Sequence, residues 1–422
     1  MSSPATFFLG VDGGARHHQL CLLDPAGEVL GEARFGANLA GLAQLRAWLA
    51  SHGPAEALCA AIERPAGPLV AALLDAGLTV WAINPKQLDR FRDRFNPAGA
   101  KDDRLDARVL ADSLRTDPRA FGQVRPAPGP VETLRGLERL RAQLVAAHLA
   151  VGCRLAAVLE EYFPAALELL DGGVPDRLLM AVLEVTCDPA QARRVQTATW
   201  ARILAAGRFR RLDAAGLTAI LRQPSPPLAP GVVAWGQVAA ACLVAQWRLL
   251  DRQRRQVEGQ IKTLLAQLTK PDPAADRPTA GVLAAVQSMP GVGPVIASTL
   301  VGEAWDLLVN RDTARLRAQA GVAPVTRQSG RTRWVLRRRA CNPRLREAVY
   351  HWARLAVQRD QAWRARYAAL RAKGHRHARS LRTIADRLLR LLLAMLRDGT
   401  TYDPARLGSR SPDKPNAVSA GA

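Results

Sequence analysis

The order of short apolar runs in the first 120 residues constrains the fold of this chain more than any other feature. Residues 6–11, 19–23 and 29–30 are predicted strands, and a turn at 24–27 separates the last two. A helix at 39–50, a strand at 57–62, a helix at 69–76, a strand at 79–83 and a helix at 103–114 follow. The pattern predicts an α/β domain over residues 1–120.

Three consecutive strands followed by alternating helices and strands are typical of an RNase H-like domain. The actin-like ATPases open in the same way, so the order alone does not separate these two folds.

The rest of the chain has the periodicity of helices. Two apolar seams predict long helices within residues 130–270, one at Leu137, Leu144, Val151 and Val158, the other at Leu250, Val257, Ile261, Leu264 and Leu268. Three arrangements are open: the helices pair as an antiparallel hairpin, they form a coiled coil between protomers, or they pack separately into the core of one chain. Residues 173–230 give weak signals and stay unassigned. Pro-rich linkers at 125–130 and 270–278 separate the regions, residues 280–400 form an all-α basic domain, and 404–422 form a disordered tail.

The basic residues of this chain are concentrated near its C-terminus. The formal net charge is +22. Residues 1–120 hold 13 Lys/Arg and 14 Asp/Glu, whereas residues 311–397 hold 23 Lys/Arg and 4 Asp/Glu. A uniformly Arg-rich proteome spreads basic residues evenly, so this distribution favours a polyanion as partner of the C-terminal region.

The cysteines and the N-terminus indicate a reduced, cytoplasmic protein without a membrane partner. Cys21, Cys59, Cys153, Cys187, Cys242 and Cys341 form no Cys-x-x-Cys pair and no zinc spacing with His. No signal peptide and no uninterrupted apolar run of membrane-spanning length is recognised.

Four acidic residues fall where the N-terminal domain brings strand and helix ends together. Asp12 ends the first strand, Glu63 follows a later strand, and Asp103 and Asp106 share one face at a helix start. Carboxylates are the ligands that Mg²⁺ prefers, and two ions about 4 Å apart can activate one phosphodiester oxygen and stabilise another. Asp103 or Asp106 alone is equally explained as a helix N-terminal charge, whereas a carboxylate delivered by the buried strand before Glu63 is costly without a function.

Two motifs in the basic domain suggest contact with nucleic acid. Gly291 and Gly293 lie in Pro-Gly-Val-Gly-Pro before a helix, as in a helix-hairpin-helix turn whose N–H groups bind phosphate, or in a plain tight turn. Ser329 lies in Gln-Ser-Gly among arginines that can balance charge on a phosphate, although a serine before glycine usually marks only a turn. The predicted nucleic-acid contacts are Arg327, Arg331, Arg333, Arg337, Arg338, Arg339, Arg376 and Arg379. The aromatic residues between 350 and 367 fit either a helical core or base stacking.

These segments resemble the DEDD transposases of the insertion sequence one-ten family, which are bridge-RNA-guided recombinases. The resemblance rests on Leu-Gly-Val-Asp at Asp12, Ile-Glu-Arg-Pro at Glu63, the Asn-Pro-Lys-Gln segment at 84–87 and Lys-Asp-Asp-Arg-Leu-Asp at 101–106. It extends to the 289–294 turn, to Gly-Val-Ala-Pro at 321–324 and to Gln-Ser-Gly at 328–330, and covers about two-thirds of the chain in the family's order.

The resemblance implies that Asp12, Glu63, Asp103 and Asp106 form a RuvC-like tetrad binding Mg²⁺, with two ions expected, and that Ser329 is the nucleophile. Family members often carry Thr after the Lys, where this chain has Asp102, so Asp102 competes with Asp103 as ligand. The resemblance also implies a structured guide RNA, donor and target DNA, and a homodimer or homotetramer with a site shared between protomers.

Three other functions remain open at this stage. The carboxylates also suit a Holliday-junction-resolvase-like nuclease that uses water. The Gly10–Gly14 segment resembles the opening of actin-like sugar kinases. A nucleic-acid-binding protein without chemistry, such as a decayed transposase, is the third alternative.

Overall fold

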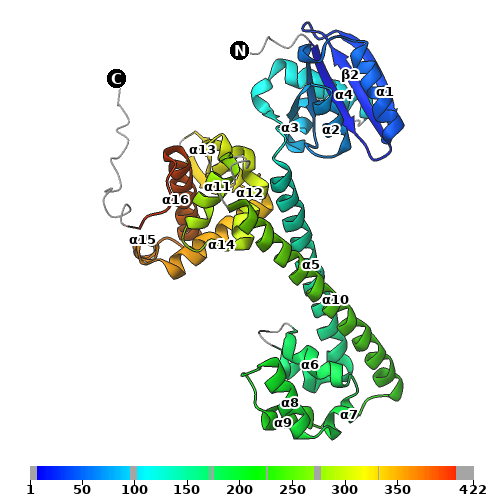
Figure 1. The fold of residues 1–422 in the computed structure, drawn as a ribbon, viewed down its shortest axis with the longest axis vertical. Helices are drawn as coiled ribbons and strands as arrows, with labels where there is room; N and C mark the ends of the chain where they lie inside the picture. Colours follow the sequence, from blue (N-terminus) through cyan, green and yellow to red (C-terminus); the bar gives the residue numbers. More distant parts are fainter. Residues whose placement is uncertain are drawn as a thin grey trace. The chain divides into compact units, whose positions relative to one another are not determined.

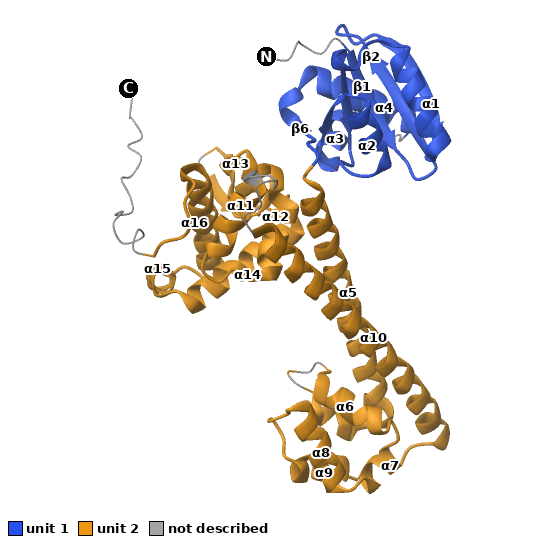
Figure 2. Cartoon of the chain, viewed as in Figure 1, with its two compact units in different colours: residues 1–126 blue, residues 127–422 orange. Residues whose placement is uncertain are grey.

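The structure is a computed structural model that describes residues 7–95, 102–170, 172, 175–224, 227–269, 277–330 and 332–404. The chain divides into two compact units, Met1–Pro126 and Ala127–Ala422 (Figure 2). Lys101, Arg331, most of the predicted 270–278 linker and the predicted disordered tail from 405 onward lie outside the described residues.

The first unit is built on a six-stranded sheet with the order β3-β2-β1-β4-β5-β6. Its strands are β1 (Phe7–Gly13), β2 (His17–Leu23), β3 (Val29–Gly36), β4 (Leu58–Ile62), β5 (Thr79–Ala82) and β6 (Gly122–Gln123). The first three strands are antiparallel, whereas β4 runs parallel to both β1 and β5. The three-strand start and the α/β alternation predicted from the sequence are confirmed.

Helices cover both faces of this sheet (Figure 1). The helices of the unit are α1 (Leu39–Ala50), α2 (Pro68–Asp75), α3 (Pro85–Arg92) and α4 (Asp103–Thr116), with short 3-10 turns at Ala55–Ala57 and Pro118–Ala120. Leu45 of α1 and Leu73 of α2 pack with Leu9 of β1 on one face. On the other face Leu88 of α3 and Leu110 of α4 pack with Ala61 of β4.

In the second unit, two long helices pack against each other in antiparallel directions. They are α5 (Gly129–Tyr162) and α10 (Pro230–Thr269). The start of α5 shares a core with the end of α10, through Val131 and Ile261, and the end of α5 shares another with the start of α10, through Leu159 and Ala240. By length and composition alone both helices could cross a membrane. Some of their apolar residues contribute to these two cores, whereas others, such as Leu149 and Val238, are exposed.

Short helices fill the region that the sequence left unassigned. Between the two long helices lie η3 (Pro164–Leu169), α6 (Arg177–Val185), α7 (Pro189–Arg194), α8 (Thr197–Gly207) and α9 (Ala214–Leu221). They pack around the fully buried Trp200. Asp176, Asp188 and Asp213 cap α6, α7 and α9 by accepting backbone N–H groups, which explains where these helices begin.

The C-terminal part of the second unit is mainly helical but also contains a β-hairpin. Its helices are α11 (Arg277–Ser288), α12 (Pro294–Val309), α13 (Thr313–Gln319), α14 (Pro343–Arg359), α15 (Gln361–Ala372) and α16 (His377–Asp398). The hairpin consists of β7 (Val325–Ser329) and β8 (Thr332–Leu336). The prediction of an all-α domain was wrong here, because these strands are exposed and carry no alternation of apolar and polar residues that marks a half-buried strand.

Candidate active site and nucleic-acid surface

Asp12 and Glu63 lie side by side at the carboxyl-terminal ends of the two central strands of the first unit's sheet, β1 and β4. Val11 pairs with Ile62 in the parallel β1–β4 register, and Asp12 and Glu63 are the next residues of these two chains. Neighbouring strands are about 4.8 Å apart. Both residues are half-buried. The adjacency follows from strand pairing, and the apolar runs before each acid indicated both strand ends.

Helix α4 brings Asp103 and Asp106 to the same end of these strands. It runs opposite to β1, since its last turn contacts the β2–β3 turn through Arg115 and Pro25, next to the start of β1. Its first turn therefore lies toward Asp12. Gly10 permits the close approach, because a Cβ there would lie 1.8 Å from the carbonyl oxygen of Ala107.

Asp106 is paired with a cation. Its carboxylate is buried and accepts a hydrogen bond from Arg92 Nε at 2.6 Å, and Arg92 also contacts Asp89 at 2.8 Å. Burial opposes the charged form of Arg92, but the hydrogen bonds and charges of Asp106 and Asp89 outweigh it and raise the Arg92 pKa. Sequence reasoning missed Arg92, whose only signal was its position near the end of a polar helical segment.

Asp102 and Asp103 are both exposed, and they play different local roles. Asp102 is the N-cap of α4 and accepts the backbone N–H of Arg104 at 3.4 Å, while Asp103 is the first residue of the helix. Capping explains Asp102, and a favourable charge at the helix N-terminus explains Asp103.

Carboxylates are suitable ligands for a hard divalent cation, but in this conformation these side chains are not close enough together to bind one metal ion. Among the described residues no three His, Cys, Asp or Glu side chains are close enough to hold a metal ion. Carboxylate oxygens are the ligands that Mg²⁺ prefers, and in this conformation the Asp106 carboxylate is paired with Arg92.

Ser329 belongs to the second unit, at the tip of the β7–β8 hairpin. It is exposed, pairs with Thr332, and its carbonyl oxygen accepts the Thr332 hydroxyl at 2.8 Å. Gly330 follows with a φ of 53°, a conformation that favours glycine. Arg327 pairs with Trp334 on the same face as Ser329, because residues two apart along a strand share a face.

The predicted arginine contacts are mostly solvent-accessible. Arg327, Arg333, Arg337 and Arg339 are exposed and Arg338 is half-buried, with no hydrogen-bond partner for its Nε within the described part of the chain. Arg376 is the N-cap residue of α16, and Arg379 lies in its first turn. Arg331 lies outside the described residues.

The Pro-Gly-Val-Gly-Pro turn joins α11 to α12, and packing explains its first glycine. Gly291 has a φ of 79°, and a Cβ there would lie 2.7 Å from the backbone nitrogen of Ala356 in α14. Gly291 is buried, whereas Gly293 is half-buried and is the N-cap of α12. Phosphate binding by this turn remains a prediction.

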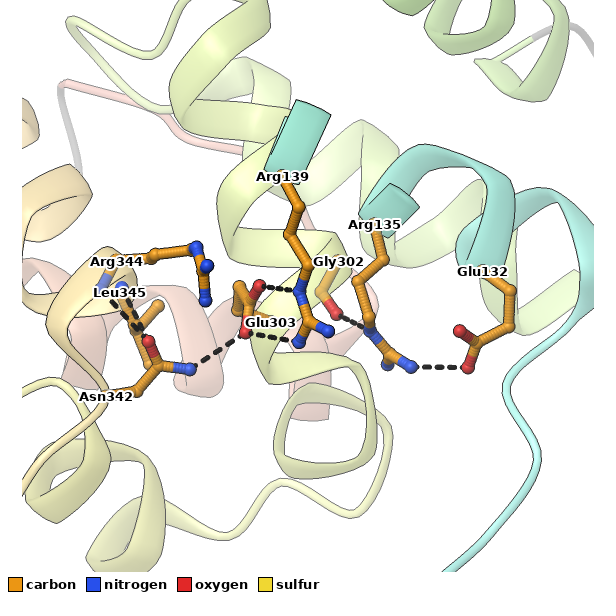
Figure 3. A network of polar contacts seen from close by, with 8 residues as sticks. All are labelled: Glu132, Arg135, Arg139, Gly302, Glu303, Asn342, Arg344 and Leu345. Carbon is orange, nitrogen blue, oxygen red and sulfur yellow. Dashed lines mark hydrogen bonds and ion pairs between the residues drawn. The ribbon is translucent and has the colours of Figure 1, made fainter. Parts of the chain in front are cut away.

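A half-buried polar network, with the Glu303 side chain at its centre, joins α5 to α12 and α14 (Figure 3). Glu303 accepts Arg139 Nε at 2.7 Å and Asn342 Nδ2 at 2.9 Å. Burial alone raises the pKa of the Glu303 carboxyl, but these hydrogen bonds and the charges of Arg139 and Arg344 hold it below its usual value. Asn342 also caps α14, so the network fixes the segment that follows the hairpin.

Comparisons with known proteins agree with this arrangement. A transposase family model of the IS110 DEDD type matches residues 9–164, and the transposase IS116/IS110/IS902 family model matches residues 283–368. The first match covers the sheet and its carboxylates and suggests that the protein depends on a divalent metal. The second covers the α11–α12 turn, the hairpin and α14.

Three curated relatives are similar to the chain. It is 33% identical over 414 residues to the "Mini-circle putative transposase for IS117" of Streptomyces coelicolor, covering 95% of this chain and 96% of the relative. It is 41% identical over 210 residues to the "Putative transposase y4uE" of Sinorhizobium fredii, covering 49% and 58%. It is 29% identical over 402 residues to the "Insertion element IS116 uncharacterized 44.8 kDa protein" of Streptomyces clavuligerus, covering 94% and 96%.

The similarity thus spans the sheet with its four acids, the long helices and the basic hairpin domain, and the chain belongs to the IS110 family of transposases and is a DNA transposase.

Proposed function

We propose that this transposase cuts and rejoins the DNA strands of an insertion sequence. Ser329 is the nucleophile, and Asp12, Glu63, Asp103 and Asp106 hold two Mg²⁺ ions. The observation that carries the proposal is the β1–β4 register, which sets Asp12 beside Glu63 at the end of a strand against which α4 packs. The family match over residues 9–164 supports a metal at these carboxylates.

Each group has a distinct task in this mechanism. The Ser329 hydroxyl loses its proton as its oxygen attacks the phosphorus, the new O–P bond replaces one P–O ester bond, and the sugar oxygen that leaves takes up a proton. In the rejoining step a sugar hydroxyl attacks the serine–phosphate ester, and the Ser329 oxygen leaves and regains a proton. Bound Mg²⁺ supplies positive charge to the phosphate oxygens and the leaving oxygen. Arg327, on the Ser329 face of the hairpin, is placed to offset the charge that grows on the phosphate. The exposed hairpin tip leaves Ser329 accessible to a bulky DNA substrate.

The carboxylates and Ser329 belong to different compact units of the chain. We propose that they act together in a homodimer or homotetramer, with the carboxylates of one protomer and the serine of another at one scissile phosphate. We further propose that a structured guide RNA selects donor and target DNA, and that the protein works in the cytoplasm. The shared site and the guide RNA follow from the family resemblance, whereas the cytoplasmic location follows from the isolated cysteines.

The test is a Mg²⁺-dependent cleavage assay on DNA carrying the element ends and the copurifying RNA. Asp12→Asn and Ser329→Ala should each abolish product, and a covalent protein–DNA adduct on a denaturing gel should disappear with Ser329→Ala. Asp75→Asn and Ser51→Ala change exposed residues of the same types and should keep activity.

The outcomes separate the alternatives. Cleavage that survives Ser329→Ala but not Asp12→Asn identifies a nuclease that uses water. Cleavage that survives Asp12→Asn removes the carboxylate site from the mechanism. Equal activity after ribonuclease treatment argues against RNA guidance.

A further inference from the structure

A cavity of about 320 Å³ lies beside the root of the β7–β8 hairpin, separate from the Ser329 tip. Four segments line it: the loop after α13, the residue after β8, α14 and α16. The lining residues are Ala320, Gly321, Val322, Arg337, Arg346, Glu347, Tyr350, Ala378, Leu381, Arg382 and Ala385. Pockets for small ligands begin at about 300 Å³.

The wall of this cavity carries an excess of positive charge. Arg337, Arg346 and Arg382 line it, and within the described residues no ion pair joins any of them to a carboxylate. Glu347 is the one acid in the lining, and its side chain is 75% exposed beside His351. Burial lowers the Arg382 pKa, and the nearby charges of Arg337 and Arg379 lower it further. Such a cluster is stabilised by an anion.

The floor of the cavity is apolar and shaped by a glycine. Ala320, Leu381 and Ala385 are each at most 2% exposed, and the Tyr350 ring lies at the rim. Gly321 has a φ of 68°, and a Cβ there would lie 3.0 Å from Cys341 Sγ and 3.4 Å from the Arg346 chain. A larger residue at 321 would fill the space that Arg346 occupies.

We infer that this cavity binds one nucleotide of the nucleic acid strand on which the transposase acts, with the phosphate at Arg337 and Arg382 and the base against the apolar floor and Tyr350. Guanidinium groups recognise phosphate, and aromatic and apolar surfaces accept any base. The inference rests on the proposed function, because it assumes that a strand approaches the hairpin.

The fold relates this nucleotide to Ser329. Arg337 directly follows β8, whose five residues span about 17 Å at roughly 3.4 Å each. The cavity and the Ser329 tip therefore lie at opposite ends of the hairpin, and one strand has to span the hairpin to contact both.

The experiment measures binding of full-length protein to fluorescent single-stranded DNA and RNA of the same sequence by anisotropy at several salt concentrations. The oligonucleotides lack the element ends and the buffer contains EDTA, so binding is measured without cleavage whether or not the catalytic proposal holds. Arg382→Gln should weaken binding several-fold. It should also reduce the salt slope, the slope of log K against log salt concentration, by about 0.7, the value for one phosphate contact on a single strand. Arg390→Gln removes the same charge from the same helix, outside the cavity lining, and should change neither.

A second measurement does not depend on a variant folding correctly. An oligonucleotide carrying 5-iodouracil, irradiated with the otherwise unsubstituted protein, should crosslink to the peptide containing Tyr350, and Tyr350→Leu should remove that crosslink. If Arg382→Gln weakens binding of single-stranded DNA more than binding of RNA, the cavity binds DNA. The opposite result means that it binds RNA. Equal effects of Arg382→Gln and Arg390→Gln, or crosslinks that map only to other segments, overturn the inference while leaving the cleavage result intact.

Discussion

Gly10 marks the closest approach between β1 and α4, the two elements that carry Asp12 and Asp103. A Cβ at this position would lie 1.8 Å from the Ala107 oxygen and 2.7 Å from the Ala111 nitrogen. Both atoms belong to the helix backbone, so a side chain has to push the whole helix away. The distance from Asp12 on β1 to Asp103 and Asp106 on α4 therefore depends on the absence of a side chain at Gly10.

We expect Gly10→Ala to destabilise the first unit by about 1–3 kcal/mol, the usual cost of overpacking, and to abolish cleavage. Urea unfolding followed by circular dichroism measures the first effect. Gly136→Ala, in α5 with no neighbour within 4 Å of the added Cβ, should instead stabilise by about 0.5–1 kcal/mol. Unfolding of Gly10→Ala at the same urea concentration as the parent protein contradicts the packing argument.

Arg92 holds the predicted ligand Asp106 in a buried ion pair, and this pair leads to a second prediction. Arg92→Met leaves a buried carboxylate without its partner, which costs about 3–5 kcal/mol. If Asp106 is a metal ligand, Mg²⁺ should recover part of this loss and raise the Tm of Arg92→Met more than that of the parent protein. Thermal unfolding with and without Mg²⁺ measures both effects, and the exposed Arg90→Met is the control. If Mg²⁺ raises the Tm of the parent protein, Arg92→Met and Arg90→Met by the same amount, Asp106 is not a ligand.

At the scale of elements, the α5–α10 pair contains a half-buried histidine at its middle, with a buried ring nitrogen. The His148 ring lies 4.2 Å from the Trp247 ring, and its Nε2 has no hydrogen-bond partner within the described residues. Burial, with smaller contributions from Arg254 and Arg255, lowers the His148 pKa below its usual 6.5, although Asp251 acts in the opposite direction. The helix pair therefore favours neutral His148.

This pKa gives a pH dependence of known sign. As the pH falls through about 6.5, the unfolded chain binds a proton at this residue before the folded chain does, so folding stability decreases. We expect the Tm of the second unit to fall from pH 7.5 to pH 5.5, and to fall less in His148→Phe. His351→Phe, at an exposed position on α14, should keep the full decrease. An identical pH dependence in both variants excludes His148 as its source.

Elements rich in apolar residues were predicted closely from the sequence, and elements poor in apolar residues were missed. The predicted helix at 39–50 has the bounds of α1. The hairpin went unseen because Thr326, Arg327 and Gln328 pair across strands without burying a face. Helix α3 was missed for a similar reason, since Leu88 is its one buried residue.

At the scale of the whole molecule, acidic and basic residues are separated along the chain. No Asp or Glu occurs between residues 313 and 346, which include the hairpin, whereas residues 1–120 are nearly neutral. Nucleic-acid affinity should therefore come from the second unit.

Replacing Arg337, Arg338 and Arg339 together with Gln should reduce the salt slope of duplex DNA binding by up to about 2.7, because each phosphate contact contributes about 0.9. The matched triple variant of Arg90, Arg94 and Arg119, which are exposed in the first unit, removes the same charge. It should leave the slope unchanged. Equal reductions in both triple variants mean that net charge, rather than the hairpin, governs binding.

The sequence by itself determined the sheet, the positions of Asp12 and Glu63 at strand ends, the two long helices and the family. These features depend on local periodicity and on short motifs, which the order of residues contains directly. It also showed that charge is concentrated in the C-terminal region.

Only the tertiary structure decided which of these residues meet other groups. Asp106 faces Arg92 of another helix, Gly291 lies against the backbone of α14, and Arg337 and Arg382 line one cavity. Each of these contacts joins segments that are separate in sequence. Local patterns do not encode them, because side chains from different elements become neighbours only when the elements pack.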